Sequence, residues 1–354
     1  MKKVTYKIIS IMTLTVCLLL TNKTHSQEVN LNQKTFIVTK KPDNNIINYA
    51  KNTFKMLVDK KYINSETNKL VLCNPFLTTS NESNDIYRFL IKDDKNIISS
   101  LVIINDKNSK NLKWQLNEGK MLNAIKEKIS KGGVYNISFK KNTTKEYSDI
   151  ILQKLSHKED LNLSSITDEL ASYKNDDFIT KKLREPDYPL PYPDERILSL
   201  NPKEVQTNNP WCAAYVGSTI LSHGLGKDIR AYDIMKWAYP GTSYSSLLNK
   251  SISDSKLISY AKTVGSNPYY VNYALSRTEI MDEILARRMI YAGCKNVYSN
   301  NFHAMLVYGY KKDVSYNVWN PWGERYVIPM SSSDIYADDD SHYYWVDSIT
   351  HWSN

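Results

Sequence analysis

Four prolines lie within eight residues at positions 186–193 of this 354-residue chain, in the run P-D-Y-P-L-P-Y-P. Proline lacks a backbone N–H and has a fixed φ angle, so such a run cannot continue a helix or a central strand. It favours an extended, stiff connection that is open to proteases. A chain of this length allows about two ordinary domains. The sequence therefore predicts two folded halves joined at this segment.

Charge changes at the same boundary. The whole chain has 46 basic and 37 acidic residues, whereas residues 187–354 have 15 basic and 17 acidic ones. The first half is therefore basic and the second slightly acidic, which favours docking of one half on the other. Solubility, or attachment to an anionic cell wall, would explain the same excess. No basic patch is interleaved with aromatic residues, so we expect no nucleic acid among the partners.

Residues 1–26 have the pattern of an export signal. Lysines occupy positions 2, 3 and 7, an apolar core runs from Ile8 to Leu20, and Thr24-His25-Ser26 is a small-x-small cleavage site. The apolar core is too short for a settled membrane span, and no later segment is longer. We therefore expect a secreted, extracellular protein with no membrane association once the signal is removed.

Three cysteines follow the signal, namely Cys73, Cys212 and Cys294. Their odd number and their spacing predict neither a disulfide framework nor a metal site, and no cofactor motif is present. Cys294 follows the apolar run Ile290-Tyr291-Ala292, which has the character of a core strand. We expect Cys294 to be a free, buried thiol.

Residues 27–186 have the helical and alternating patterns of a separate α+β domain. The expected helices are Ile46–Val58 and Met121–Ser130, and the expected strands are Lys69–Cys73, Tyr87–Ile91, Ile97–Ile104, Leu112–Leu116 and Val134–Phe139. No residues of this half have catalytic spacing. Any chemistry is therefore expected within residues 187–354.

The strongest chemical signal is the stretch Q-T-N-N-P-W-C-A-A-Y at positions 206–215. The apolar run 213–221 predicts a short helix that is stopped by Gly224 and Gly226. Cys212 would then lie in the first turn, where unpaired N–H groups and the helix dipole stabilise a thiolate.

Gln206 lies six residues before this cysteine. A loop of that length can fold back, so that the Gln206 side-chain N–H and the Cys212 backbone N–H form an oxyanion hole. For Cys212 alone, a buried or disulfide-bonded residue remains the alternative. A catalytic role requires a base and a residue that orients it.

Both appear downstream, in a predicted hairpin. His303 opens the alternating run H-A-M-L-V-Y-G-Y at 303–310, and a second strand at 316–320 ends with Asn320. A turn about Lys311-Lys312 would place His303 opposite Asn320 on one face of the hairpin. Asn320 would then orient the imidazole that takes the proton from Cys212. For His303 alone, a strand histidine with a structural role is the alternative.

These residues resemble a known family. The order Gln206, Cys212, His303, Asn320 is that of papain-like cysteine peptidases, and residues 320–323 match their Asn-x-Trp-Gly segment. The resemblance implies that the indole of Trp322 shields the hydrogen bond between His303 and Asn320.

The staphopains, secreted peptidases of Gram-positive bacteria, are more similar still. Their Trp-Cys-Ala-Gly-Tyr resembles the segment from Trp211 to Tyr215, their Gly-His-Ala-Met resembles 302–305, their Trp-Asn-Pro-Trp is identical to 319–322, and their closing His-Tyr-x-Trp recurs at 342–345. Phe302 and Ala214 depart from the family pattern, which affects the expected groove shape and substrate preference. The resemblance covers residues 188 to 352.

The resemblance implies an α+β chain with a papain-like, two-lobe catalytic domain, preceded by a separate α+β pro domain. A helical lobe would carry Cys212, and an antiparallel sheet lobe would carry His303. The expected helices are Tyr232–Tyr239, Leu257–Val264 and Thr278–Arg288, and the expected strands are Met289–Ala292, 303–310, 316–320 and Arg325–Ile328, with the aromatic-rich end Tyr336–Trp352 packed against the sheet.

We therefore expect a secreted cysteine endopeptidase made as an inactive precursor. Its parts would be a signal peptide (1–26), an inhibitory pro domain (27–186) and a peptidase domain (187–354), with activating cleavage near Arg184 to Tyr188. Cys212 would be the nucleophile, His303 the base and then the acid, Asn320 the orienting residue and Gln206 the oxyanion donor, with Trp211 and Trp322 in support. Expected partners are protein or peptide substrates and the chain's own pro domain, and a dedicated protein inhibitor would fit the same resemblance.

Two alternatives remain at this stage. Bacterial cell-wall hydrolases also use a Cys-His pair with a polar third residue, so a peptidoglycan amidase or endopeptidase is the first. The second is a secreted binding protein that keeps the fold without catalysis. Substrate choice separates the first alternative from a protein peptidase, and labelling of Cys212 by an electrophile tests the second.

Overall fold

The computed structural model describes the chain in segments. They cover residues 35–37, 42–63, 70–80, 84–93, 97–119, 122–123, 125, 133–141, 148–155, 192–299, 301–338 and 341–352. The predicted signal, the expected cleavage site and most of the helix expected at Met121–Ser130 lie outside these residues. Within them, no helix has the length and apolar character needed to cross a membrane.

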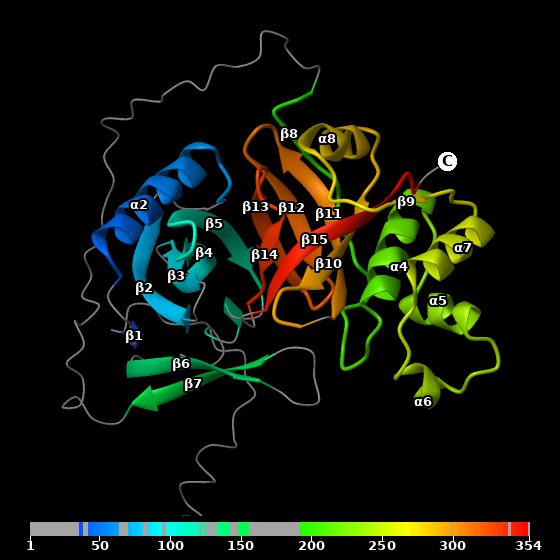
Figure 1. The fold of residues 1–354 in the computed structure, drawn as a ribbon, viewed down its shortest axis with the longest axis horizontal. Coiled ribbons are helices and arrows are strands. Elements are labelled where there is room, and N and C mark those ends of the chain that lie inside the picture. Colours follow the sequence, from blue (N-terminus) through cyan, green and yellow to red (C-terminus); the bar gives the residue numbers. More distant parts are fainter. Residues whose placement is uncertain are drawn as a thin grey trace, which may run out of the picture.

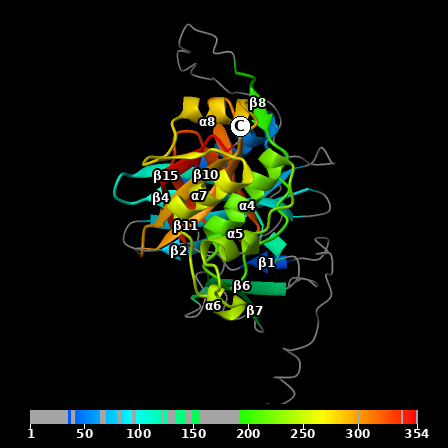
Figure 2. The same cartoon turned by 90° about the vertical axis from the view of Figure 1, so that its right-hand side faces the viewer.

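The C-terminal half combines a group of helices with a sheet (Figure 1). Its helices are α4 (Cys212–Leu225), α5 (Ala231–Ala238), α6 (Tyr244–Leu247), α7 (Asp254–Val264) and α8 (Arg277–Leu285), and its strands are β8 (Glu195–Ile197), β9 (Tyr269–Val271), β10 (Ile290–Asn296), β11 (Phe302–Lys311), β12 (Ser315–Asn320), β13 (Glu324–Pro329), β14 (Asp334–Tyr336) and β15 (His342–Thr350). Helices α4, α5 and α7 lie together on one side of the strands, toward the viewer in Figure 2. This arrangement confirms the α+β class and fits the two-lobe fold that the resemblance implies.

Helix α4 is the centre of the helical part. Residues 213–221 are all buried, and the helix packs against β10, β11, α5 and α7. A helical segment that is buried on every side belongs to a core. The helix ends at Gly226, the second of the two glycines predicted to stop it, which adopts a left-handed φ of 64°.

The strands of the C-terminal half form one antiparallel sheet. Its order is β14-β15-β10-β11-β12-β13, with β8 beside β11 and β9 beside β15. Trp345 and Trp352, in and after the last strand, are each only 1% exposed. The aromatic-rich C-terminal end therefore packs in the core, as predicted.

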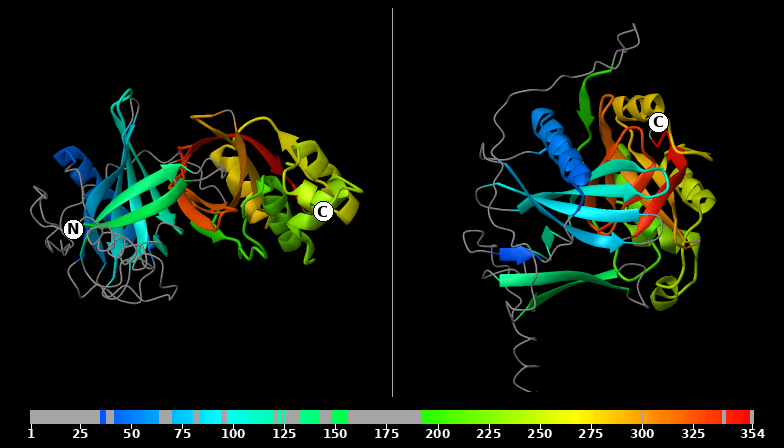
Figure 3. Two further views of the ribbon diagram at one scale, coloured as in Figure 1. Left: turned by 90° about the horizontal axis from the view of Figure 1, so that it is seen from below. Right: turned by 60° about the vertical axis from the view of Figure 1, so that its left-hand side comes forward.

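The N-terminal half has a core of its own. It contains β1 (Thr35–Ile37), α2 (Asn44–Asp59), β2 (Val71–Ser80), β3 (Asn84–Lys92), β4 (Ile97–Asp106), β5 (Asn111–Glu118), β6 (Gly133–Lys141) and β7 (Ser148–Leu155). Helix α2 lies across strands of this half in the right-hand view of Figure 3, and Ile46, Ala50, Phe54 and Leu57 recur at helical spacing to pack on them. Strands β1, β6 and β7 form a second, three-stranded sheet. Strand β7 was not predicted, and β2 extends past Pro75, which its edge position tolerates.

The two halves share a sheet. Strand β5 pairs with β13, with Leu116 opposite Val327, Asn117 opposite Tyr326 and Glu118 opposite Arg325. The strand order therefore continues from β13 through β5, β4 and β3 to β2. Figure 3, on the left, shows the two halves side by side along this direction. The N-terminal half thus has its own core, but its strands β2 to β5 continue the sheet of the C-terminal half, and the domain boundaries stay a prediction.

One buried and one partly exposed ion pair reinforce this junction. Arg88 of β3 forms an ion pair with Asp338 at 3.0 Å and donates a second hydrogen bond to the carbonyl oxygen of Ala337 at 2.9 Å. Lys113 of β5 pairs with Asp334 at 2.8 Å. Basic side chains of the N-terminal half therefore meet acidic side chains of the C-terminal half, in the direction that the charge split predicts.

Candidate active site

Cys212 is the first residue of α4, as predicted. The residue before it, Trp211, caps the helix without a side-chain hydrogen bond, and the first turn has no acidic residue. No carboxylate in that turn therefore competes with a thiolate for the positive end of the helix. The indole N–H of Trp211 donates to the carbonyl oxygen of Leu247 at 2.9 Å. Trp211 thus anchors the start of α4 to the helical part.

Gln206 is buried beside this helix start. Its backbone N–H donates to the carbonyl oxygen of Pro321 at 2.7 Å, and its side-chain amide donates to the carbonyl oxygen of Asn209 at 2.7 Å. A primary amide has two N–H donors, so one remains for a further acceptor. The loop that carries Gln206 therefore docks on the turn after Asn320, and the role in an oxyanion hole stays a prediction.

His303 and Asn320 lie on adjacent strands, but the predicted register is wrong. The hairpin turns later than Lys311-Lys312, because Lys311 itself lies opposite Ser315. A β-bulge between Val307 and Gly309 then shifts the pairing by one residue. Without the bulge, the register at the turn would place Asn320 on the opposite face from His303, since side chains alternate along a strand. The bulge restores the shared face.

A hydrogen bond joins the two side chains, with 2.9 Å between His303 Nε2 and Asn320 Oδ1. Asn320 Nδ2 donates to Glu324 Oε2 at 3.0 Å, and the Trp322 backbone N–H donates to Asn320 Oδ1 at 3.2 Å. A carboxylate only accepts hydrogen bonds, so the amide must present its oxygen to the imidazole. His303 therefore carries its proton on Nε2, and its Nδ1 lone pair is available to accept another.

Aromatic rings enclose the imidazole. Trp322 stacks on His303 with 4.3 Å between ring centroids, and Tyr343 lies at 5.3 Å. His303 is only 3% exposed, and its Nδ1 has no hydrogen-bond partner among the described residues. Burial lowers the pKa of His303 to about 4, so the ring is neutral near pH 7. A neutral imidazole is the form that can act as a base.

Cys294 lies directly opposite His303, on strand β10. It is fully buried and forms no disulfide, as predicted. Burial is the main cause that raises the pKa of its thiol, and the charges of Asp347 and Cys212 raise it further. Cys294 is thus an inert core thiol. The effect of the Cys212 charge on its pKa indicates that the start of α4 lies near the strand beside His303.

Two carboxylates lie behind this region. Burial and the negative charge of Asp254 raise the pKa of Asp347 to about 6. Tyr291 donates a hydrogen bond to Asp254 at 2.8 Å. Asp347 Oδ1 lies over Gly293, where an added Cβ would be only 1.8 Å away, and it has no hydrogen-bond partner among the described residues. Glycine at 293 is therefore required by the Asp347 carboxylate.

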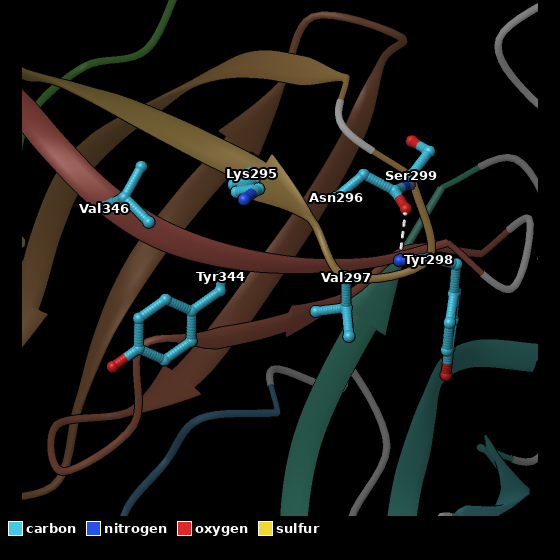
Figure 4. Close-up of a pocket in the computed structure, with 7 residues that line it drawn as sticks. All are labelled: Lys295, Asn296, Val297, Tyr298, Ser299, Tyr344 and Val346. Carbon is cyan, nitrogen blue, oxygen red and sulfur yellow. Dashed lines mark hydrogen bonds between the residues drawn. The ribbon is translucent and has the colours of Figure 1, made fainter.

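A separate cavity of about 410 Å³ lies at the end of β10 (Figure 4). It is lined by Lys295, Asn296, Val297, Tyr298, Ser299, Tyr344 and Val346. Lys295 pairs with Phe302 and with Tyr344, so its side chain lies on the sheet face away from His303. The residues that line this cavity include no cysteine, histidine, aspartate or glutamate. Within the described residues there is also no group of three metal-binding side chains.

Residues 195–352 match the model of the family described as Staphopain peptidase C47. The resemblance inferred from the sequence is thereby confirmed. Staphopain A of Staphylococcus aureus strain MSSA476 is 27% identical over 164 residues, which are 42% of this chain and 40% of that protein. Staphopain B of the same strain is 28% identical over 158 residues, with the same coverage. These matches support a cysteine peptidase in the C-terminal half, and the chain spans about 40% of the length of these curated relatives.

Sequence reasoning missed several residues of the candidate site. Asn209 accepts from the Trp211 backbone N–H at 3.3 Å, in addition to holding Gln206. Glu324 lies opposite Asn320 across the hairpin of β12 and β13. Two weak signals were available: the Asn-Asn-Pro turn before Cys212 for Asn209, and the alternation in the strand after Gly323 for Glu324.

Proposed function

We propose that this protein is a secreted cysteine endopeptidase made as an inactive precursor. The observation that carries the proposal is the hydrogen bond between His303 and Asn320, which leaves the neutral Nδ1 lone pair available, together with a cysteine at the start of a buried helix. A cysteine, a neutral histidine and an orienting amide are the parts that acyl transfer through a thiolate requires. The match of residues 195–352 to a peptidase family supports the same chemistry.

In the proposed reaction, His303 Nδ1 takes the proton of the Cys212 thiol, and the sulfur attacks the peptide carbonyl carbon. The Cys212 backbone N–H and the remaining Gln206 amide N–H stabilise the oxyanion. The C–N bond breaks as His303 returns its proton to the leaving amine. A water molecule then hydrolyses the thioester, with His303 again as the base. Asn320 holds the imidazole throughout, and Trp322 covers their hydrogen bond.

We assign the N-terminal half an inhibitory role. Support comes from its attachment: β5 pairs with β13, which is the neighbour of the strand that carries Asn320. The proline-rich segment is a short tether, which makes the effective concentration of one half for the other high. Removal of the N-terminal half after a cut near Arg184 to Tyr188 would then release activity.

Substitution of Cys212 tests the proposal. Cys212→Ala should abolish hydrolysis of casein and of a fluorogenic peptide by the processed enzyme, whereas Cys294→Ala, the same change at the inert core thiol of the same half, should retain both activities. Normal hydrolysis by Cys212→Ala would refute the proposal. Purified peptidoglycan is the second substrate, because its hydrolysis in place of casein would identify a cell-wall hydrolase. Failure of a chloromethyl ketone to label Cys212 would favour a non-catalytic binding protein.

A further inference from the structure

Behind Asn320 lies a pair of buried side chains that the reaction above does not use. Glu324 and Tyr326, on strand β13, are each 1% exposed. Asn320 Nδ2 donates to Glu324 Oε2 at 3.0 Å and to the Tyr326 hydroxyl oxygen at 3.2 Å. The Tyr326 hydroxyl in turn donates to Glu324 Oε2. Both amide hydrogens of Asn320 are therefore held by this pair.

We propose that Glu324 and Tyr326 are positioning residues that fix the Asn320 amide and, through it, the tautomer of His303. This inference rests on the proposed function. An amide group can rotate by half a turn, which exchanges its oxygen and its nitrogen at little cost unless neighbours distinguish them. A carboxylate accepts only, so Glu324 holds the nitrogen side of Asn320 and leaves the oxygen side for His303.

The tautomer follows from this orientation. When Asn320 Oδ1 faces the imidazole, His303 Nε2 must carry the proton and donate it. His303 Nδ1 then keeps the lone pair that accepts the thiol proton of Cys212. With the amide reversed, its N–H group would face Nε2 and select the tautomer protonated at Nδ1. That ring cannot accept the thiol proton at Nδ1. Glu324 therefore acts two hydrogen bonds away from the proton transfer.

Electrostatics supports the same role. An imidazolium forms when His303 takes the proton, and a buried carboxylate behind Asn320 stabilises that positive charge. Burial and the Glu324 charge together raise the pKa of Tyr326 well above its usual value. Tyr326 therefore stays protonated and keeps donating to Glu324 across the whole working pH range.

The pair lies directly beneath the junction of the two halves. Asn117 of β5 lies opposite Tyr326. At Gly119, which has a φ of 144°, an added Cβ would lie 3.0 Å from Glu324 Cα and 3.1 Å from its Cγ. The end of β5 thus packs against the backbone and side chain of Glu324. The test therefore uses the full chain as well as the processed enzyme.

The variants are Glu324→Gln and Tyr326→Phe, which keep side-chain shape. Tyr316→Phe is the matched control, since Tyr316 is an equally buried tyrosine on β12 whose hydroxyl donates to Ser332. In the full chain, the alkylation rate of Cys212 by iodoacetamide is followed from pH 5 to 9 by peptide mass spectrometry, and nitrogen NMR of labelled histidine reports the His303 tautomer. In the processed enzyme, kcat and KM are measured with a fluorogenic peptide.

Glu324→Gln should slow Cys212 alkylation near pH 7 by roughly tenfold or more, the scale for loss of a hydrogen bond to a charged group. It should also narrow the pH range of rapid alkylation and populate the Nδ1–H tautomer. Tyr326→Phe should act in the same direction by a smaller factor, and Tyr316→Phe should match the wild type. In the processed enzyme, kcat should fall with little change in KM.

An unchanged tautomer and an unchanged pH profile in folded Glu324→Gln would overturn the positioning role. If that variant does not fold, Tyr326→Phe decides by the same two readouts. If the wild-type protein cleaves no peptide but the variants still shift the tautomer and the alkylation rate, the positioning role stands and the proposed peptidase function fails. The two outcomes are thus separate.

Discussion

The folded structure disfavours the charged form of the Asp347 carboxylate and so raises its pKa. The carboxylate is partly buried over Gly293, close to the negative charge of Asp254. A raised native pKa means that the folded protein holds a proton that the unfolded chain releases. Between the unfolded value near 3.8 and the folded value of about 6, stability therefore falls as pH rises, and the full penalty remains above pH 6.

Replacement of Asp347 by asparagine tests this sign. Asp347→Asn should stabilise the protein at pH 7.5 by roughly 1 kcal/mol, after allowance for the partial exposure of the group. The gain should shrink toward zero at pH 4, where the native carboxyl is already protonated. Urea unfolding of both proteins at the two pH values measures the difference. A variant that is less stable than the wild type at pH 7.5 would show that the Asp347 charge is stabilising.

At the residue scale, the sequence indicated the candidate catalytic residues but not the residues that hold them in place. Gln206, Cys212, His303 and Asn320 stood out because their order and their flanking residues resemble those of a known family. Glu324 could not be found in this way, since a glutamate after a turn is usually exposed. Only the pairing of β12 with β13, with Asn320 opposite Glu324, buries its carboxylate beside an amide.

At the scale of elements, the periodicity of apolar residues predicted most helices and strands correctly. The predicted register of the hairpin that carries His303 and Asn320 was wrong. The predicted helices 46–58, 232–239 and 257–264 correspond to α2, α5 and α7. The bulge between Val307 and Gly309 has no signal in the alternating pattern, because a bulge depends on what lies beside the strand. Here β8 passes so close that an added Cβ at Gly309 would lie 3.1 Å from Ile197 Cα. The bulge that gives Asn320 and His303 a shared face thus lies where β8 begins to pair with β11.

Helix α4 is held against α7 by a close approach at Gly217. An added Cβ there would lie 2.6 Å from Leu257 Cδ1. Gly217→Ala should therefore destabilise the protein by roughly 1 kcal/mol, because overpacking of about 1–3 kcal/mol exceeds the helix propensity gain of about 1 kcal/mol. Urea unfolding measures this change.

Two comparisons isolate the contact between α4 and α7. Gly224→Ala is the same change in the same helix, but its Cβ would meet only a carbonyl oxygen at 3.8 Å, so no loss is expected there. The double variant Gly217→Ala with Leu257→Ala should be less destabilised than the sum of the single variants, since the new methyl enters space that the smaller side chain leaves. Strict additivity would contradict the predicted clash.

At the scale of the whole molecule, charge predicted that the halves dock but not how they dock. The pairing of β5 with β13 joins strands about 200 residues apart, and local patterns carry no information on which two edges meet. Buried side chains at the junction also form hydrogen bonds with particular partners in the other half. Gln115 Nε2 donates to the Tyr336 carbonyl oxygen at 2.7 Å, and Asn117 Nδ2 donates to Asp338 Oδ1 at 2.9 Å. A shared sheet with buried partners binds more tightly than opposite surface charge alone.

One consequence is that a single cut in the proline-rich segment should not separate the halves. Arg88→Met should weaken their association by roughly 3 kcal/mol, the scale for one lost partner of a buried ion pair, because Asp338 would lose its cation. After limited proteolysis near Arg184 to Tyr188, size-exclusion chromatography on dilution gives the affinity of the halves. Peptide hydrolysis over the same dilution series follows the release of activity.

Lys107→Met is the matched control. Lys107 pairs with Asp85 inside the N-terminal half at 2.9 Å, so the substitution removes one positive charge without changing the junction. Salt concentration separates the contribution of exposed charges from that of the buried ion pair. Screening acts on the half-exposed pair of Lys113 with Asp334 and on long-range steering, whereas the pair of Arg88 with Asp338 lies out of reach of solvent ions. High salt should therefore slow reassociation of the wild-type halves more than it speeds their separation. Complete separation of the wild-type halves on cleavage alone would mean that the shared sheet does not hold them together.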